Sequence, residues 1–265
     1  MTLLAWILVF SLLGGVLSVL AAATLLAVPP ALRDRAMPHM VSFATGALLG
    51  AAFLGLLPEA LEGAGHDNLH AVTGAVLGGL LLFFVLEKLV LWRHCHEDQC
   101  EGHGHDAHAG GRRRSTGALI IVGDGLHNFV DGVLIGAAFM TDVSLGIVTA
   151  LAVAAHEIPQ EVGDFVILIH SGYSRARAFV LNVLCSLTTV VGALLAYLGL
   201  SPDSVALPYV IAVAVASFIY IAVGDLIPGL HRRTDLPGGI KQVVLISAGV
   251  AVIALAAESL HAHGG

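Results

Sequence analysis

The chain has 265 residues, of which 57% are hydrophobic and only 12% are charged, and its formal net charge is −7. Ordinary soluble domains contain about 25% charged residues, so this composition excludes a water-soluble globule and predicts an all-α integral membrane protein. The long continuous apolar runs exclude a barrel of short alternating strands, and the 31 glycines suit helices that pack closely in lipid.

Eight apolar runs are long enough to cross a bilayer, which takes about 20 residues. In chain order they are Leu3–Val28, Met37–Leu57, Ala71–Trp92, Gly117–Met140, Ser144–Ile169, Ala176–Leu200, Val205–Leu230 and Ile240–Leu260. Proline, glycine and serine occupy the breaks, where helices are expected to end. The first run has no positive residue before it and is too long for the apolar part of a signal peptide, so we expect a retained helix. Residues 1–265 are therefore expected to form a single transmembrane transporter-like domain.

The positive charges predict the orientation of the chain. All twelve lysines and arginines lie in or beside the odd-numbered connections, whereas the even-numbered connections carry acids such as Glu59, Asp142 and Asp203. Connections rich in lysine and arginine stay in the cytoplasm, so both termini are expected outside or in the periplasm. The sequence thus predicts a multi-pass protein of the cell (inner) membrane, embedded in the lipid bilayer, and its charge gives no reason to expect a nucleic-acid partner.

Two of the predicted helices carry polar residues near their centres, where lipid excludes them. Within each helix these residues share one face. They are Asp124, His127, Asn128 and Asp131 in the fourth helix, and His156, Glu157, Gln160, Glu161 and Asp164 in the fifth. Both histidines come about 15 Å along their helices, so the two polar stripes are expected to face each other at the middle of the bilayer.

The residue types in these stripes indicate a metal path. Imidazole and carboxylate groups suit divalent first-row ions such as zinc, iron(II) or manganese, and the absence of thiolates argues against a sealed structural zinc site. Asp131 is spaced to bridge two adjacent ions. The alternative is a hydrogen-bond network that only joins the helices, which unpaired charges in lipid would oppose.

Weaker signals flank the stripes. Asn182 and Ser186 share a face of the sixth helix and would either complete a second metal site or form packing hydrogen bonds. Asp225 in the seventh helix would line the pathway. These three residues, with Asp124 and Asp164, form a second tier of candidates.

The motifs His127-Asn128-Phe129-Val130-Asp131-Gly132 and His156-Glu157-Ile158-Pro159-Gln160-Glu161 resemble the paired signatures of the ZIP family of divalent metal transporters. The resemblance covers the whole chain and points to a prokaryotic member of the branch whose fifth helix reads HEXPHE. It implies that helices 1–3 and 6–8 form an inverted repeat around helices 4 and 5, with a binuclear metal site between those two helices.

The resemblance also implies the metal ligands. His127, Asp131, His156 and Gln160 would form the first site, and Asn128, Asp131, Glu157, Gln160 and Glu161 would form or border the second. Gln160 departs from the family, in which this position is usually His or Glu. Because a neutral amide is a weaker ligand, the departure leaves open whether the second site is occupied.

A His-rich segment at about residues 93–115 joins the third and fourth helices. Its metal-binding residue types are His94, Cys95, His96, Cys100, His103, His105 and His108. Such tracts bind zinc-like ions loosely, so the segment is either a cytoplasmic acceptor or sensor of metal, or a solvated linker. All three cysteines are expected to be free thiols.

Together these features predict a transporter, not an enzyme, that carries divalent transition-metal ions into the cytoplasm without an organic cofactor. Zinc is the favoured substrate, with iron, manganese and cadmium as further candidates. The alternative is an intramembrane zinc-dependent hydrolase, which needs a base in the pattern H-E-x-x-H. Gln160 at the fifth position and Pro159 within the helix disfavour it. A metal-gated channel or sensor is the third class of protein that fits the sequence. A homodimer is a candidate assembly.

Overall fold

The computed structural model describes residues 1–98, 109–231 and 236–263, which form helices almost throughout. In chain order these are α1 (Leu3–Leu12), η1 (Leu13–Leu17), α2 (Ser18–Ala27), α3 (Pro30–Gly50), η2 (Ala51–Leu56), α4 (Leu57–Ala64), η3 (His66–Asn68), α5 (Leu69–Asp98), α6 (Ala109–Thr141), α7 (Val143–His170), α8 (Arg175–Gly199), α9 (Leu207–Tyr220), η4 (Ile221–Leu226), α10 (Ile227–Leu230) and α11 (Leu236–His263). Within the described residues, eight helical spans are long and apolar enough to cross a membrane, which confirms the predicted number.

The second span begins earlier than the sequence predicted. It starts at Pro30 instead of Met37, so that only Val28 and Pro29 separate it from α2. Proline is tolerated in the first turn of a helix, because the N–H that it lacks would have no partner there. The charged residues from Arg33 onward therefore lie on the helix, where a connection was expected.

The helices beside the His-rich segment are also longer than predicted. α5 continues past Trp92 to Asp98, and α6 begins at Ala109, ahead of Gly117. Both helices therefore extend into the ends of the segment that was expected to connect them. The predicted metal-binding residues Cys100, His103, His105 and His108 lie outside the described residues.

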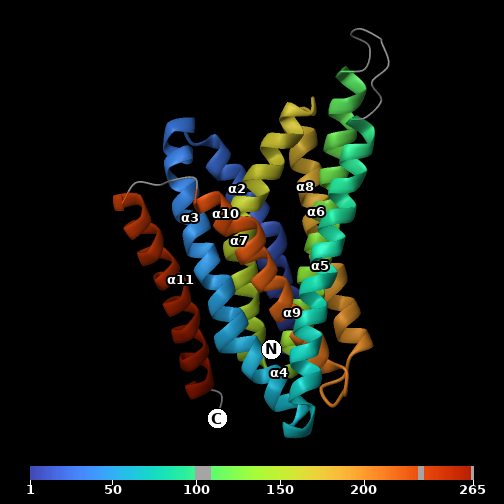
Figure 1. Ribbon diagram of the computed structural model, residues 1–265, viewed down its shortest axis with the longest axis vertical. Coiled ribbons are helices and arrows are strands. Elements are labelled where there is room, and N and C mark those ends of the chain that lie inside the picture. The colour runs from blue at the N-terminus through green and yellow to red at the C-terminus, as the bar shows by residue number, and fades with distance from the viewer. Residues whose placement is uncertain (99–108, 232–235, 264–265) are drawn as a thin grey trace.

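The bundle has two distinct ends (Figure 1). The ends of α2, α5, α7 and α10, which lead into the odd-numbered connections, lie together at the top, and both termini lie toward the bottom. We call these the odd end and the terminal end. This arrangement agrees with the predicted grouping of the connections.

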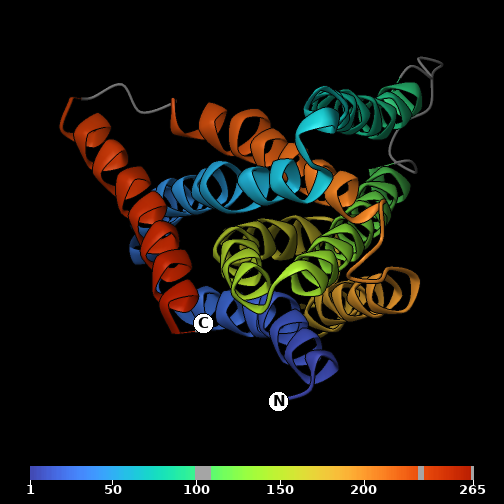
Figure 2. The same ribbon diagram turned by 90° about the horizontal axis from the view of Figure 1, so that it is seen from below.

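One helix occupies the interior of the bundle. Viewed along its length, α7 lies between α1 and α2 on one side and α3 on the other, with α6 and α8 beside it (Figure 2). By contrast, the spans that contain α5 and α11 are mostly exposed. In each of them only 11% of an apolar window of 18 residues is buried inside the bundle. These two helices form the periphery and face the surrounding lipid.

A very short connection places α6 and α7 side by side. Asp142 alone separates them, and its carboxylate accepts hydrogen bonds from the N–H groups of Ser144 (2.7 Å) and Leu145 (3.1 Å). This N-cap starts α7 directly after α6 ends. Because His127 and His156 stand nearly equal numbers of residues before and after Asp142, the antiparallel helices bring both to the same depth.

Close glycine contacts hold the helix pairs together. A Cβ added to Gly132 of α6 would lie 1.9 Å from the carbonyl oxygen of Thr189 on α8, and one added to Gly192 of α8 would lie 2.1 Å from that of Phe129. A Cβ added to Gly46 of α3 would meet the carbonyl oxygen of Ile246 on α11 at 2.0 Å. Such backbone-to-backbone contact is typical of helices that associate in lipid, as the glycine content predicted.

Two spans share a local irregularity that the sequence analysis missed. The π-helical segments η2 and η4 each have six residues, and the α-helix that follows each one has a proline in its first turn, at Pro58 and at Pro228. The second and seventh spans run in opposite directions, so η2 lies toward the terminal end and η4 toward the odd end. π-Helical bulges of this kind frequently occur at functional sites.

Candidate metal site

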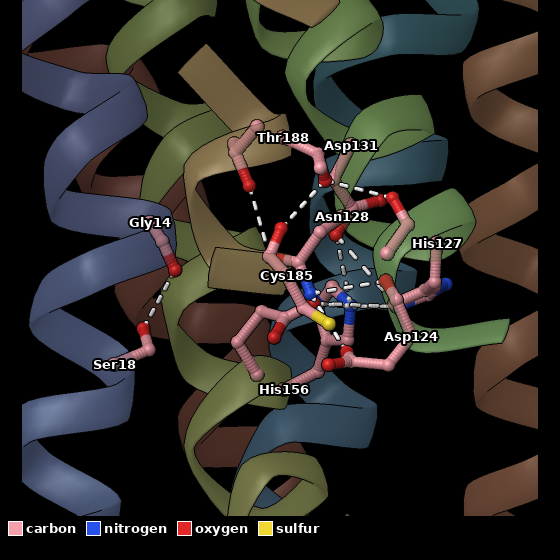
Figure 3. Close-up of polar contacts among 12 residues, drawn as sticks. Gly14, Ser18, Asp124, His127, Asn128, Asp131, His156, Cys185 and Thr188 are labelled. Atoms are coloured by element: carbon pink, nitrogen blue, oxygen red, sulfur yellow. Dashed lines mark hydrogen bonds and ion pairs between the residues drawn. The ribbon is translucent and has the colours of Figure 1, made fainter. Parts of the chain in front are cut away.

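The polar stripes of α6 and α7 converge at the middle of the bundle, as predicted (Figure 3). Asp131, His156 and Glu161 are 0% exposed and Glu157 is 1% exposed. Asp124 is 6% exposed. Burying a charged group without a partner is costly, so what surrounds these carboxylates decides the chemistry of the site.

The first group of potential ligands contains two imidazoles and two carboxylates. Nε2 of His127 and Nε2 of His156 are 3.3 Å apart. Oδ2 of Asp131 lies 3.3 Å from Nε2 of His156 and 3.8 Å from Nε2 of His127, and Oε1 of Glu157 lies 3.4 Å from Nε2 of His127. A tetrahedral zinc ion, with ligands at about 2.0–2.2 Å, holds its ligand atoms about 3.3–3.6 Å apart. The spacing in this group is therefore suitable for one such ion.

A backbone contact fixes which nitrogen His156 presents to the group. Its Nδ1 lies 3.1 Å from the carbonyl oxygen of Ala152, one turn earlier on α7. A carbonyl oxygen can only accept, so Nδ1 carries a proton and donates it. In the neutral imidazole Nε2 then has a free lone pair, directed at His127 and Asp131. Metal-binding histidines are commonly oriented by a hydrogen bond of this kind.

The second group contains three carboxylates. One oxygen each from Asp124, Glu157 and Glu161 lies within 4.8 Å of the others. Glu157 is common to both groups, whereas Asp131, the residue expected to bridge, belongs to the first group alone. Oxygen ligands without nitrogen give the second group a harder character than the first.

Three of the four carboxylates in these groups have no hydrogen-bond donor. Among the described residues, the buried side-chain oxygens without a hydrogen bond are both oxygens of Asp131, Glu157 and Glu161, together with Oγ1 of Thr149. The approach of Asp131 to His156 is not a hydrogen bond for a neutral imidazole, because Nε2 has no proton to donate. Native proteins rarely leave buried polar groups unsatisfied, so six orphaned carboxylate oxygens at one place indicate a site for cations.

Asn128, which the sequence analysis placed among the ligands of the second site, has other partners here. Its amide nitrogen donates to Oδ1 of Asp124 at 2.8 Å, and its Oδ1 accepts from the hydroxyl of Thr189 at 2.9 Å. Asn128 thus orients Asp124 and is itself held by α8. Thr189 was not among the residues predicted from the sequence, although it lies on the same face of α8 as Asn182 and Ser186 and helical periodicity indicates it.

The second-tier residues differ in their positions. Asn182 is buried and its amide lies 3.5 Å from the backbone carbonyl of Glu161, while the hydroxyl of Ser186 donates to the carbonyl of Val183. Both contacts fit the packing interpretation. Asp164 and Gln160 are half-buried on α7, and Asp225 is exposed on η4. Cys185 is a free thiol, as predicted, and donates to the carbonyl of Ile121 at 3.3 Å.

The site is closed toward the terminal end and more open toward the odd end. On the terminal side, residues 134–140 of α6 are all buried, and Phe139 packs against Phe10 with ring centroids 5.6 Å apart. On the odd side, Gln160 and Asp164 are only half-buried. The side chain of His127 is 22% exposed, against 1% or less for its three neighbours in the group. The exposure of these side chains therefore increases from the buried ligands toward the odd end.

This fold and site define a class of protein: a helical membrane protein with a buried cluster of histidines and carboxylates, suited to bind cations, between two central helices. The sequence model of the family described as ZIP Zinc transporter matches residues 1–108 and 93–257. The chain belongs to the ZIP zinc transporter family.

Individual relatives agree with this assignment. The chain is 31% identical to Zinc transporter ZIP13 of Pongo abelii over 231 residues, which cover 83% of this chain and 66% of the relative. It is 32% identical to Zinc transporter ZIP4 of Mus musculus, covering 75% of this chain and 39% of the relative. For Zinc transporter zipt-7.2 of Caenorhabditis elegans the identity is 31%, with 82% and 57% covered. The chain thus spans less than two thirds of the length of each of these relatives.

Proposed function

We propose that this protein carries divalent transition-metal ions, zinc foremost, across the membrane and into the cytoplasm. The ions would bind between α6 and α7, with His127, Asp131, His156 and Glu157 as the first ligands. The observation that carries the proposal is the set of orphaned oxygens on Asp131, Glu157 and Glu161. A divalent cation would satisfy these acceptors together in the interior of a membrane bundle.

The charge of the site supports two ions. Asp124, Asp131, Glu157 and Glu161 together supply four negative charges when ionised, and two divalent cations would neutralise them. Glu157 would bridge the ions because it belongs to both groups. Gln160 shares the α7 face of His156 but brings no charge, so the second ion would be held mainly by Asp124, Glu157 and Glu161, with Asn128 orienting Asp124.

The uneven access to the site supports transport by alternating exposure. Buried apolar residues that include Phe139 cover the site on the terminal side, whereas Gln160 and Asp164 on the odd side are half-buried, so an ion would reach the site from the odd end. Under the positive-inside rule the odd end is cytoplasmic, so the described state would be inward-facing. To take up an ion from outside, α6 and α7 must move relative to the helices that pack against them.

The matched π segments support the expected inverted repeat. In an arrangement of helices 1–3 and 6–8 around α6 and α7, the second and seventh spans would be equivalent and antiparallel. Both carry a six-residue π segment followed by proline. Such repeats let a transporter open on one side and close on the other by equivalent movements.

Asp225 of η4 would receive the ion on its way to the odd end. Its side chain is exposed. Tyr220, one turn earlier, donates a hydrogen bond to Glu87 of α5. The His-rich segment at about residues 93–115 includes the end of α5 and the start of α6, and it would act as a metal acceptor at the same end of the bundle. Iron, manganese and cadmium as further substrates, a homodimer, and membership of the HEXPHE branch stay predictions.

Zinc influx into liposomes tests the proposed function. The full chain is reconstituted with a zinc-sensitive dye inside, and the initial rate is measured against external zinc concentration. We expect saturable influx that His127→Ala and Asp131→Ala each reduce at least about tenfold, because each change removes a ligand. Asp203→Ala, which removes an exposed carboxylate from an even-numbered connection, should leave the rate unchanged. Equal rates in all variants would refute the site.

The hydrolase alternative predicts a different result for Glu157→Gln. In a zinc hydrolase this change removes the general base and abolishes cleavage of a peptide or lipid while metal stays bound. In the proposed transporter it removes a bridging ligand and weakens metal binding itself. Metal content after dialysis, measured on the purified variant, distinguishes the two outcomes. The relatives named above are zinc transporters, which favours the second.

A further inference from the structure

A polar pocket lies between two membrane helices at the odd end, far along the chain from the α6 and α7 stripes. It is lined by Pro38, His39 and Ser42 of α3 and by Pro237, Gly238, Lys241, Gln242 and Leu245 of α11. The amide of Gln242 donates to the carbonyl of Leu230 at the end of α10, which fixes the inner wall. Just below, α3 and α11 touch backbone to backbone at Gly46.

Among the described residues, no acidic side chain is paired with the basic residues at the pocket. Within the described part of the chain, Lys241 has no ion-pair partner, and neither has Arg35, which lies one turn before His39 on the same face of α3. The acid nearest along α3 is Asp34, whose carboxylate is paired with Arg33 at 3.4 Å. The positive end of the α11 dipole also lies here, because α11 begins at Leu236. The pocket therefore suits an anion.

The surface beside the pocket is strongly apolar. Ile240, Val243 and Val244 of α11 are 57%, 64% and 61% exposed, and α11 is a peripheral helix. A cationic pocket that continues into an exposed apolar face matches an amphiphile with an anionic head. Basic pockets between membrane helices bind the head groups of anionic lipids in this way.

We propose that this pocket binds the phosphate of an anionic phospholipid in the leaflet at the odd end. Lys241 and His39 would donate to the phosphate oxygens, Arg35 would attract them from one turn away, and the acyl chains would lie along Val243 and Val244. The lipid would join α11 to α3 at the level of the head groups, where the two helices are not in backbone contact.

Native mass spectrometry of the purified full chain tests the proposal. The protein in detergent receives equal amounts of a phosphatidylglycerol and a phosphatidylcholine with the same acyl chains. We expect the wild type to retain phosphatidylglycerol in preference, and Lys241→Gln to reduce this preference about fivefold, since one basic residue near a membrane surface contributes about that factor. Lys88→Gln, at the chain's other lysine and outside the pocket, is the matched control and should bind as the wild type does.

Two further arms decide the source of the phosphate and the specificity of the pocket. Millimolar inorganic phosphate should leave the amount of retained phosphatidylglycerol unchanged. If phosphate lowers that amount to the one retained by Lys241→Gln, the assignment to a lipid is overturned. Equal losses in Lys241→Gln and Lys88→Gln would overturn the pocket, because they would show a general charge effect. Unchanged melting temperatures for both variants, which alter exposed side chains, establish that the comparison is between folded proteins.

Discussion

Nε2 of His127 lies 3.3 Å from Nε2 of His156, and the rings meet nearly perpendicular, at 82°. Since Nδ1 of His156 donates to the carbonyl of Ala152, its Nε2 presents a lone pair to the other imidazole. Nε2 of His127 then either donates its own proton to that lone pair or, when it carries no proton, shares a metal ion with it. Protons and zinc therefore compete for the same space.

This competition predicts that zinc affinity falls as the pH is lowered. Protons and metal ions compete for the same imidazole lone pairs, so lowering the pH favours the protonated imidazoles and displaces the metal. Between about pH 7.5 and pH 5.5 we expect at least about tenfold weaker binding of zinc to the detergent-purified protein by titration calorimetry. His66→Ala, a change in the exposed connection after α4, should show the same pH dependence. An affinity independent of pH would contradict the assignment of His127 and His156 as ligands.

Glu161→Gln is expected to stabilise the metal-free protein. Both carboxylate oxygens of Glu161 are buried without a hydrogen bond, beside Asp124 and Glu157, and removing one uncompensated charge should raise the free energy of unfolding by about 1–3 kcal/mol. The same change removes a ligand, so the rise in melting temperature caused by zinc should shrink. Thermal unfolding with chelator and with zinc measures both effects. Glu258→Gln neutralises an exposed carboxylate and should alter neither; a less stable metal-free Glu161→Gln would refute the argument.

The glycine contact between α6 and α8 predicts a large difference between two alanine substitutions in one helix. A Cβ at position 132 would lie 1.9 Å from a backbone oxygen, whereas one at Gly123 would meet nothing within 4 Å. Gly132→Ala must push the helices apart and is expected to cost about 1–3 kcal/mol. Gly123→Ala should be neutral or stabilise α6 by up to about 1 kcal/mol. Melting temperatures of the two purified variants provide the test, and similar values would show that the helices are not in contact here.

Thr189 should influence the second group of ligands through Asn128. Thr189→Val keeps the shape of the side chain but removes the donor to Oδ1 of Asn128, so the amide that orients Asp124 becomes free to rotate. We expect a loss of about 1–2 kcal/mol of stability and a lower metal-to-protein ratio at limiting zinc, measured by elemental analysis. Occupancy of the first group, which does not include Asp124, should persist. If Thr189→Val binds the full complement of metal with wild-type affinity, Asn128 has no role in positioning Asp124.

The sequence established the elements and the chemistry that they carry. The scarcity of charge predicted eight membrane spans, and helical periodicity placed His127 with Asp131 and His156 with Glu157 on single faces. These features depend on local spacing and on the cost of polar groups in lipid, both of which a sequence displays directly. The boundary at Pro30 was misjudged because charged residues interrupt the apolar run there, although they do not interrupt the helix.

Only the tertiary structure decided how the polar groups divide among partners. The sequence predicted Asp131 as the bridging residue and Asn128 as a ligand. In the folded chain, however, Asn128 is hydrogen-bonded to Thr189 of α8 and to Asp124, and the rotation of α7 places Glu157 in both groups. Nor could the sequence show that the residues on the terminal side of the site are more deeply buried than those on the odd side. Such features depend on distances between helices, which glycine contacts such as Gly132 against Thr189 set through packing, and packing is a property of the folded chain as a whole.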